Sequence, residues 1–152
     1  MTELPKDLRE ALEAEEAGEL DRLLRRRRQR DFEILRSLLS LDPTVPPDFR
    51  TKAMYALSRW GDASVVPDIV QLLPHLDEHG RISALSALGR LEAPEATPAI
   101  LEHTGDPSPQ VRKAAAQALS RIGTPEAVAR LRELAANDPE AWIRELAARH
   151  AP

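Results

Sequence analysis

The chain has 152 residues, a formal net charge of −4 at pH 7, and only two tryptophans, one tyrosine and two phenylalanines. Few aromatic residues beside abundant alanine and leucine disfavour a β-sandwich and are typical of closely packed helices. The chain has no cysteine, which excludes disulfides, a thiolate nucleophile and a cysteine-ligated zinc site. The N-terminal stretch is charged, and no apolar run has the length of a signal-peptide core or a membrane span, so we expect a cytoplasmic protein with no membrane partner.

Residues 1–41 predict an irregular helical unit. Gly18 is expected to divide its first half into two helices, along which leucines recur at helical spacing. These leucines are Leu4, Leu8, Leu12, Leu20, Leu23 and Leu24. The segment 35–38 matches the second-helix segment 131–134 of a copy described below, so we interpret residues 1–41 as an atypical first copy of a repeat.

The strongest local concentration of charge follows residue 24 and consists of Arg25, Arg26, Arg27, Arg28 and Arg30. Six arginines against two acids give residues 25–36 a balance of +4, whereas three basic and eight acidic residues give residues 1–24 a balance of −5. Such a cluster is a candidate site for nucleic acid or another polyanion. No base-stacking aromatic residues are interleaved with it. The other interpretation is therefore the solvated end of a helix, facing the helix dipole or the acidic cluster of Glu13, Glu15, Glu16 and Glu19.

Three nearly identical segments recur with a period of 31 residues, at 56–61, 87–92 and 118–123. A fixed period of this length predicts a solenoid of stacked helix pairs, because one pair cannot bury its apolar face without neighbours. In the third copy Gly123 is expected to end the first helix, and Thr124 and Pro125 to begin the second. We predict a single α-solenoid domain over residues 1–152, with the irregular unit followed by repeats at 42–76, 77–105 and 106–137 and a half-repeat cap at 138–152.

The third copy carries a recognisable order of residue pairs. Asp-Pro, Val-Arg, Ala-Ala, Ala-Leu and Ile-Gly follow one another in residues 106–123, and Pro-Glu-Ala occupies 125–127. This pattern resembles the HEAT repeat family, in particular the short bacterial HEAT-like repeats of phycobilisome lyases, over residues 42–151. The resemblance implies an all-α, armadillo-like, right-handed superhelix of about four helical hairpins. It does not imply one activity, since the family includes adaptors, enzyme subunits, nucleic-acid binders and bilin lyases.

Arginines recur at two positions of the repeat. The first column is Arg50, Arg81, Arg112 and Arg144, and the second is Arg59, Arg90 and Arg121. A column of arginines could form a track for phosphates. We favour a structural interpretation for the first column, in which each arginine pairs with an acid near the start of its own helix. Those acids are Asp48, Asp77, Asp106 and Asp138, and the pattern resembles the Asp and Arg ladder of HEAT-like repeats.

The second helices of such a solenoid are expected to line its concave face and to carry the recognition surface. Aligning the copies selects the partner-binding residues Asp68, Gln71, Glu95, Glu102, Glu126, Arg130 and Glu133. This face leans acidic, which favours a basic protein partner whose identity the sequence does not give. The predicted function is a non-catalytic protein–protein interaction scaffold, and a solvated face without a partner stays open as the alternative.

Aromatic residues add two further candidates. Trp60 stands where other copies have Leu91 and Ile122, which predicts a core position. Tyr55 and Trp142 stand at positions that are polar in other copies, so they are candidate interface anchors, although Trp142 could instead cover the open end of the stack.

The sequence offers no constellation for catalysis. His75 and His79 have the spacing of a helical metal pair, but the repeat register puts them in a loop between copies. The His-Glu pairs of HEAT-repeat di-iron hydroxylases are absent, as are a nucleophile elbow and a phosphate-binding glycine loop. We therefore predict no catalytic residues, no metal and no cofactor. The alternatives kept open are a polyanion binder acting through Arg25 to Arg30 and a bilin-lyase-like enzyme subunit.

Overall fold

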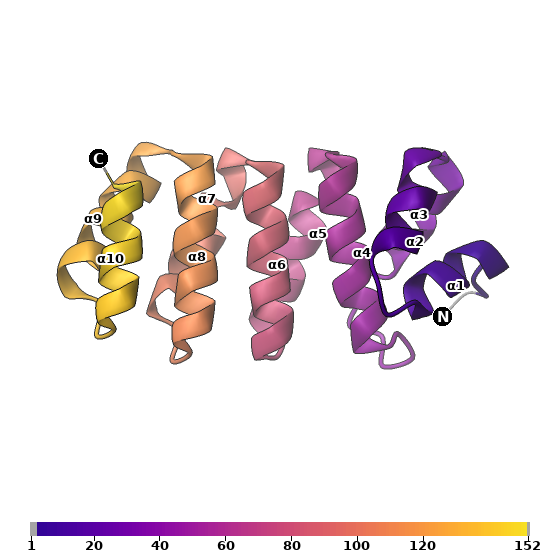
Figure 1. Cartoon of the computed structure of the whole chain (residues 1–152), viewed down its shortest axis with the longest axis horizontal. Helices are drawn as coiled ribbons and strands as arrows, with labels where there is room; N and C mark the ends of the chain where they lie inside the picture. The colour runs from indigo at the N-terminus through magenta and orange to yellow at the C-terminus, as the bar shows by residue number, and fades with distance from the viewer. Residues whose placement is uncertain (1–2, 152) are drawn as a thin grey trace.

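From residue 47 onward, helices that follow one another along the chain alternate between two rows, which together form an elongated stack (Figure 1). The computed structural model describes residues 3–151, and within that range the regular elements are helices with no strand. The predicted all-α solenoid is confirmed. The two ends of the predicted domain, residues 1–2 and 152, lie outside the described residues.

The first row holds the first helix of each copy. Its members are α4 (Pro47–Trp60), α6 (Glu78–Leu91), α8 (Pro109–Ile122) and α10 (Ala141–His150). The second row holds α5 (Val66–Leu72), α7 (Thr97–Glu102) and α9 (Pro125–Asn137). Short 3-10 turns flank α5 and α7, namely η1 (Ala63–Val65), η2 (Leu73–His75), η3 (Pro94–Ala96) and η4 (His103–Gly105).

Proline explains why α5 and α7 begin later in the repeat than α9. Pro67 and Pro98 occupy one repeat position, where α9 has Ala129. A proline inside a helix lacks the N–H that would bond to the residue four positions earlier. In these two copies the turn before the proline is a 3-10 turn, and the α-helix begins only at the residue before it.

Left-handed residues end the first-row helices. Gly61 after α4 has φ +82° and Gly123 after α8 has φ +66°, a conformation that glycine adopts without strain. Glu92 takes the same role after α6 with φ +52°. The predicted end of the first helix at Gly123 and the start of its partner at Pro125 are therefore both observed, and Thr124 caps α9 by accepting a hydrogen bond from the Ala127 amide at 3.2 Å.

The core lies between the two rows and repeats with the sequence period. The fully buried residues include Leu57, Leu88 and Leu119 from the first row and Ile69, Ile100 and Leu131 from the second. Within the first row, α6 and α8 approach closely where Gly89 faces Ala118, because a Cβ at Gly89 would lie 2.9 Å from the Ala118 Cα. Small residues at this position let the backbones of the two helices pack closely.

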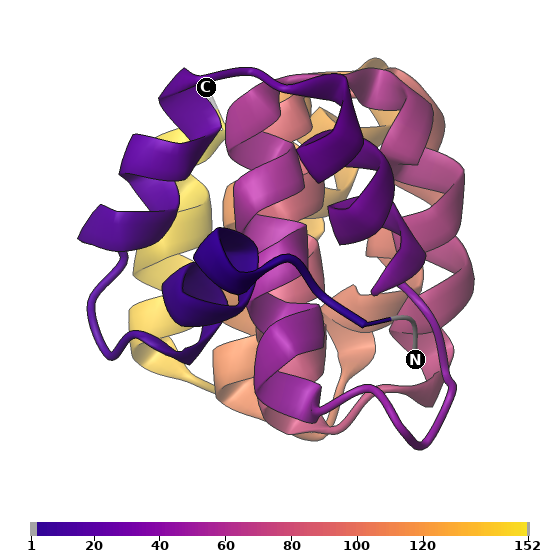
Figure 2. The same cartoon turned by 90° about the vertical axis from the view of Figure 1, so that its right-hand side faces the viewer.

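Three helices form the N-terminal end of the stack: α1 (Lys6–Glu13), α2 (Gly18–Arg25) and α3 (Gln29–Ser37). Gly18 is the first residue of α2, so the predicted division of this segment is confirmed. All six leucines predicted to form its apolar stripe are buried. In the end-on view α1 crosses in front of α4, which it contacts (Figure 2). Among the described residues, no helix is both long enough and apolar enough to cross a bilayer.

Candidate functional site

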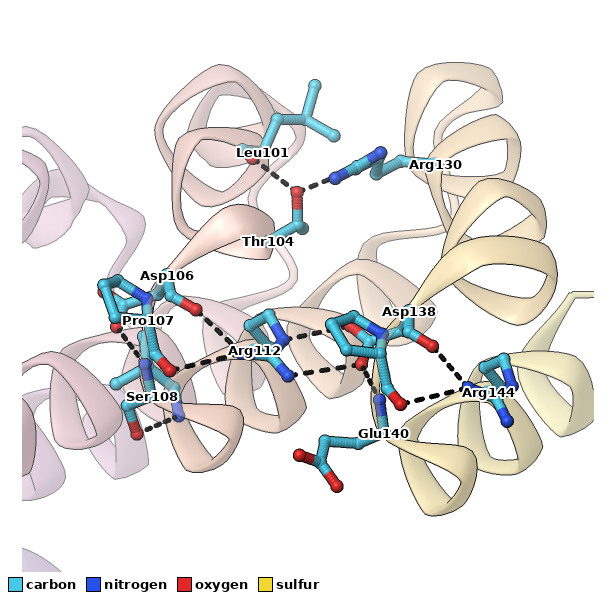
Figure 3. Close-up of polar contacts among 12 residues, drawn as sticks. Leu101, Thr104, Asp106, Pro107, Ser108, Arg112, Arg130, Asp138, Glu140 and Arg144 are labelled. Carbon is cyan, nitrogen blue, oxygen red and sulfur yellow. Dashed lines mark hydrogen bonds and ion pairs between the residues drawn. The ribbon is translucent and has the colours of Figure 1, made fainter.

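The first arginine column forms a ladder that links successive copies (Figure 3). Arg112 of α8 donates from Nε to Asp138 Oδ2 at 3.0 Å and from its Nη2 to Oδ1 at 3.3 Å. One copy earlier, Arg81 Nε lies 3.1 Å from Asp106 Oδ2. The predicted pairing of the first column with loop acids is therefore observed for Asp106 and Asp138. Each acid, however, belongs to the loop at the start of the next copy and not to the start of the arginine's own helix.

Each ladder arginine also binds carbonyl groups of the loop before its own helix. Arg112 Nη1 donates to the Asp106 carbonyl at 2.9 Å, and Arg144 Nη1 donates to the Asp138 carbonyl at 2.6 Å. At the N-terminal end of the column, Arg50 Nε donates to the Ser40 carbonyl at 2.7 Å. In Arg112 all three guanidinium nitrogens are engaged in this way, which favours a structural role for the first column over a phosphate track.

Most of the arginine cluster is also engaged within the molecule. Arg28 bridges two acids, with Nη2 2.5 Å from Asp7 Oδ2 and Nε 2.8 Å from Asp31 Oδ2. Arg26 and Arg30 lie 3.7 and 3.8 Å from Asp7. The predicted helix end is observed, since α2 ends at Arg25, but the acids that face the cluster are Asp7 and Asp31 and not the four glutamates.

The remaining arginines of the cluster differ in their surroundings. Arg27, with φ +46°, lies over the Trp60 ring at 5.0 Å from the ring centre and donates to the Trp60 carbonyl at 3.4 Å. Trp60 in turn packs on Phe32 at 5.4 Å between ring centres. Trp60 is therefore part of the core margin, half-buried beneath an arginine. Arg25 is exposed.

Electrostatics fix α1 against the start of α3. The hydrogen bond from the Arg28 guanidinium holds the pKa of Asp7 below its usual 3.8. The same hydrogen bond, together with that to Asp31, raises the pKa of Arg28. Asp31 is buried, and Arg30 supplies a second cation 3.5 Å from its Oδ1. The ion pairs among Asp7, Arg28, Arg30 and Asp31 therefore connect α1 to α3.

The seven residues predicted to bind a partner all lie on the second row or on its 3-10 turns. Five of them are exposed: Gln71, Glu95, Glu102, Glu126 and Glu133. Asp68 is half-buried and forms an ion pair with Arg36 at 2.9 Å. Arg130 forms an ion pair with Glu133 at 2.7 Å. It also donates from Nε to the Thr104 hydroxyl at 2.8 Å (Figure 3). The face is acidic, but part of its charge is already paired.

The first row carries two adjoining hollows that the sequence interpretation did not select. One, of about 330 Å³, lies between the α1–α2 connection and helices α4 and α6, and its lining is mainly apolar. The other, of about 550 Å³ and more polar, lies over α6 and α8 and reaches the end of α10. Because Ser86 and Arg90 line both hollows, the two hollows form one groove, here called the first-row groove.

Tyr55 and the second arginine column form part of this groove. The Tyr55 hydroxyl is hydrogen bonded to Asp21 Oδ1 at 3.1 Å, and the guanidinium carbons of Arg59 and Arg90 lie 5.9 and 5.4 Å from the ring centre. Arg90 Nη1 also donates to Ser58 Oγ at 2.8 Å. The sequence contained a sign of the groove. Tyr55 shares a repeat position with Ser86, and the arginines of the second column follow one helical turn later.

The two histidines with the spacing of a metal pair lie in different elements. His75 lies in η2 and His79 in α6, so the predicted loop between them is shorter than expected and the two residues belong to different helices. In residues 3–151 no group of three or more His, Cys, Asp or Glu side chains is arranged to hold a metal ion.

Trp142, one of the two candidate interface anchors, lies at the start of α10 and is 37% exposed.

A family model for HEAT repeats matches residues 66–150, which is more than half of the chain. The chain belongs to the HEAT repeat family. Among solved structures, this HEAT repeat protein is similar to the complex of CpcE and CpcF of phycocyanin lyase from Nostoc sp. PCC7120, with a TM-score of 0.67 and 18% sequence identity. The match covers 99% of this chain and 65% of that chain. At this identity the likeness establishes the fold alone. No curated protein matches the sequence.

Proposed function

We propose that this HEAT repeat protein is a non-catalytic protein-interaction scaffold whose second-row face holds a basic partner protein. The observation that carries the proposal is the exposure of Glu95, Glu102 and Glu126 on elements whose opposite sides are fixed in the core. A rigid core beneath a solvated, charged face lets that face meet a partner without a large ordering cost. The carboxylates then steer a basic surface and fix its register.

The similar solved structure is a complex of two proteins, CpcE and CpcF, which makes a protein partner the natural expectation here as well. A subunit of a lyase-like enzyme is the second candidate, favoured by the match of that fold over 99% of this chain. The present chain covers only 65% of its counterpart, so the activity of the larger protein is not carried over. Tetrapyrrole binding, read by visible absorbance after mixing with a bilin, tests this candidate.

The polyanion alternative has less support. Arg26, Arg28 and Arg30 already face Asp7, and Arg27 is stacked on Trp60. Binding of a nucleic acid would have to displace these contacts. Its signature is a steep loss of affinity as salt rises.

The test of the scaffold is the double variant Glu102→Lys and Glu126→Lys. Glu133 is left unchanged because its reversal would also break the ion pair with Arg130. Protein captured from a nuclease-treated lysate by the wild type should be lost by this variant. The matched control is Glu13→Lys and Glu145→Lys, which changes the net charge equally at exposed sites away from the second row. Equal capture by the double variant, or equal loss in the control, would rule out the second-row face.

A further inference from the structure

We propose that the first-row groove is a second binding site, and that it takes an acidic peptide segment of a partner protein. An apolar side chain of the peptide occupies the hollow beside Tyr55, and a carboxylate binds Arg90 and Arg121 in the adjoining hollow. The site lies on the opposite row from the face of the proposed function and does not depend on it. Together the two sites would let one chain hold two partners of opposite charge.

The first hollow has the character of an anchor site. Its lining includes Ala11, Leu20, Tyr55 and Ile82, contributed by four different helices. Its size, about 330 Å³, falls at the lower end of the range for ligand pockets. Lys52 closes one side of it through bonds from Nζ to the carbonyls of Leu12 at 2.5 Å and Ala14 at 2.8 Å. The α1–α2 connection is thereby tied to α4, so the hollow is preformed and would not have to be assembled on binding.

The second hollow is suited to a carboxylate. Arg90 and Arg121 line it together with His150, and Glu92 is the one acid in that lining. The Arg90 guanidinium is held by Ser58 and by the Tyr55 ring, so its position is fixed before a ligand arrives. A planar guanidinium binds a carboxylate through paired, charge-assisted hydrogen bonds. In this hollow Arg90 and Arg121 face a single acid, Glu92, and this local excess of positive charge favours an acidic ligand.

The repeat geometry sets the spacing of the ligand groups. Neighbouring packed helices lie about 8–10 Å apart, and an extended peptide advances about 3.3 Å per residue. A large apolar residue and an Asp or Glu about three positions away would therefore reach both hollows. Glu15 and Glu16 line the first hollow and repel a second carboxylate there, which fixes the orientation of the peptide along the groove.

The test uses a phage-displayed library of random linear peptides, selected on the whole protein and followed by fluorescence anisotropy with the enriched sequences. The key variant is Ser86→Trp, which fills the junction of the two hollows at an exposed residue without removing a described contact of the core. The matched control is Gln71→Trp, which adds the same side chain at an exposed position of the second row. Arg121→Glu reverses one cation at another exposed position.

We expect the selection to enrich peptides that carry a large apolar residue and an acidic residue about three positions apart. Their affinity should fall about tenfold or more in Arg121→Glu and in Ser86→Trp, and stay unchanged in Gln71→Trp and in the Glu102 and Glu126 double variant. Enrichment of basic sequences, no enrichment, or peptides that bind Ser86→Trp as tightly as the wild type would overturn the proposal. Displacement of the peptide by a single-stranded oligonucleotide at equal charge concentration would identify a general polyanion site instead. None of these outcomes depends on the second-row face.

Discussion

At the scale of single residues, Gly89 shows how the close approach of α6 and α8 constrains the sequence. Glycine inside a helix normally costs about 0.5–1 kcal/mol relative to alanine. Replacing Gly89 with alanine would recover that cost, but the steric clash outweighs it. A Cβ would lie 2.9 Å from the Ala118 Cα and 3.1 Å from its Cβ. We expect Gly89→Ala to destabilise the protein by about 1–3 kcal/mol, measured by urea denaturation.

Gly18 provides the matched comparison. It begins α2 and has no neighbouring atom within 4 Å of the position a Cβ would take. Gly18→Ala should therefore leave the free energy of unfolding unchanged or raise it by up to about 1 kcal/mol. If both glycine variants gained stability, the backbones of α6 and α8 could not be packed as closely as described.

The buried ion pair of the ladder and a surface ion pair of the same chemistry should contribute differently to the free energy of unfolding. The side chains of Arg112 and Asp138 are 9% and 1% exposed, whereas those of Arg36 and Asp68 are 43% and 31% exposed. Arg112→Met leaves a buried carboxylate without its cation, and we expect a loss of about 3–5 kcal/mol. Arg36→Met should cost less than about 1 kcal/mol in the same urea titration. Similar losses for the two variants would contradict the structural role of the ladder.

At the scale of elements, the contact between α1 and the start of α3 should depend on pH. The pKa of Asp7 is lowered in the folded state by the hydrogen bond from Arg28, so the contact contributes stability above the unfolded value near 3.8. That contribution is lost as the pH falls through the lower, folded pKa. Amide exchange in α1 should accelerate accordingly when the pH is taken from about 6 to about 3, after correction for intrinsic exchange.

Asp7→Asn isolates this effect from the titration of other carboxyl groups. The variant lacks the charge at every pH, so α1 should exchange faster than in the wild type at about pH 6 and converge with it below the folded pKa of Asp7. Parallel exchange profiles for the two proteins at all pH values would show that Asp7 does not hold α1.

The elements also show what a sequence can predict. The first-row helices, their glycine ends and the buried columns follow from a 31-residue period, because each copy meets the same neighbours. The acid that pairs with Arg112 was assigned to the wrong copy, since the choice depends on which loop packs against the arginine. The apolar half of the first-row groove was missed for a related reason: it exists only because the α1–α2 connection folds back on α4. Tyr55 was singled out by its polar repeat position, but its partner Asp21 is 34 residues away.

At the scale of the whole molecule, the rows carry different chemistry on one continuous core. The second row exposes carboxylates, and the first row has a groove with an apolar and a cationic half. A stack of this kind allows the two faces to vary separately, because the core residues that join copies are distinct from those that meet solvent. Because the core residues and the solvent-exposed residues are distinct, a charge can be changed on one face without loss of the fold.

A repeat stack should also unfold unevenly along its length, since each copy is stabilised by its neighbours. The helix α10 buries Ile143 and Ala147, whereas α8, covered on both sides, buries residues from Val111 to Leu119. Trp142 in α10 and Trp60 in α4 report on the two ends. We expect the Trp142 fluorescence of the Trp60→Phe variant to change at lower urea than the Trp60 fluorescence of the Trp142→Phe variant.

Adding Ile143→Ala to each single-tryptophan protein tests whether the difference arises at α10. This substitution removes a fully buried side chain and should cost about 2–5 kcal/mol locally. The urea midpoint seen by Trp142 should then fall further, while the midpoint seen by Trp60 should move much less. Superimposed transitions before and after the substitution would mean that the stack unfolds as one cooperative unit, because a local loss would then be felt equally at both ends.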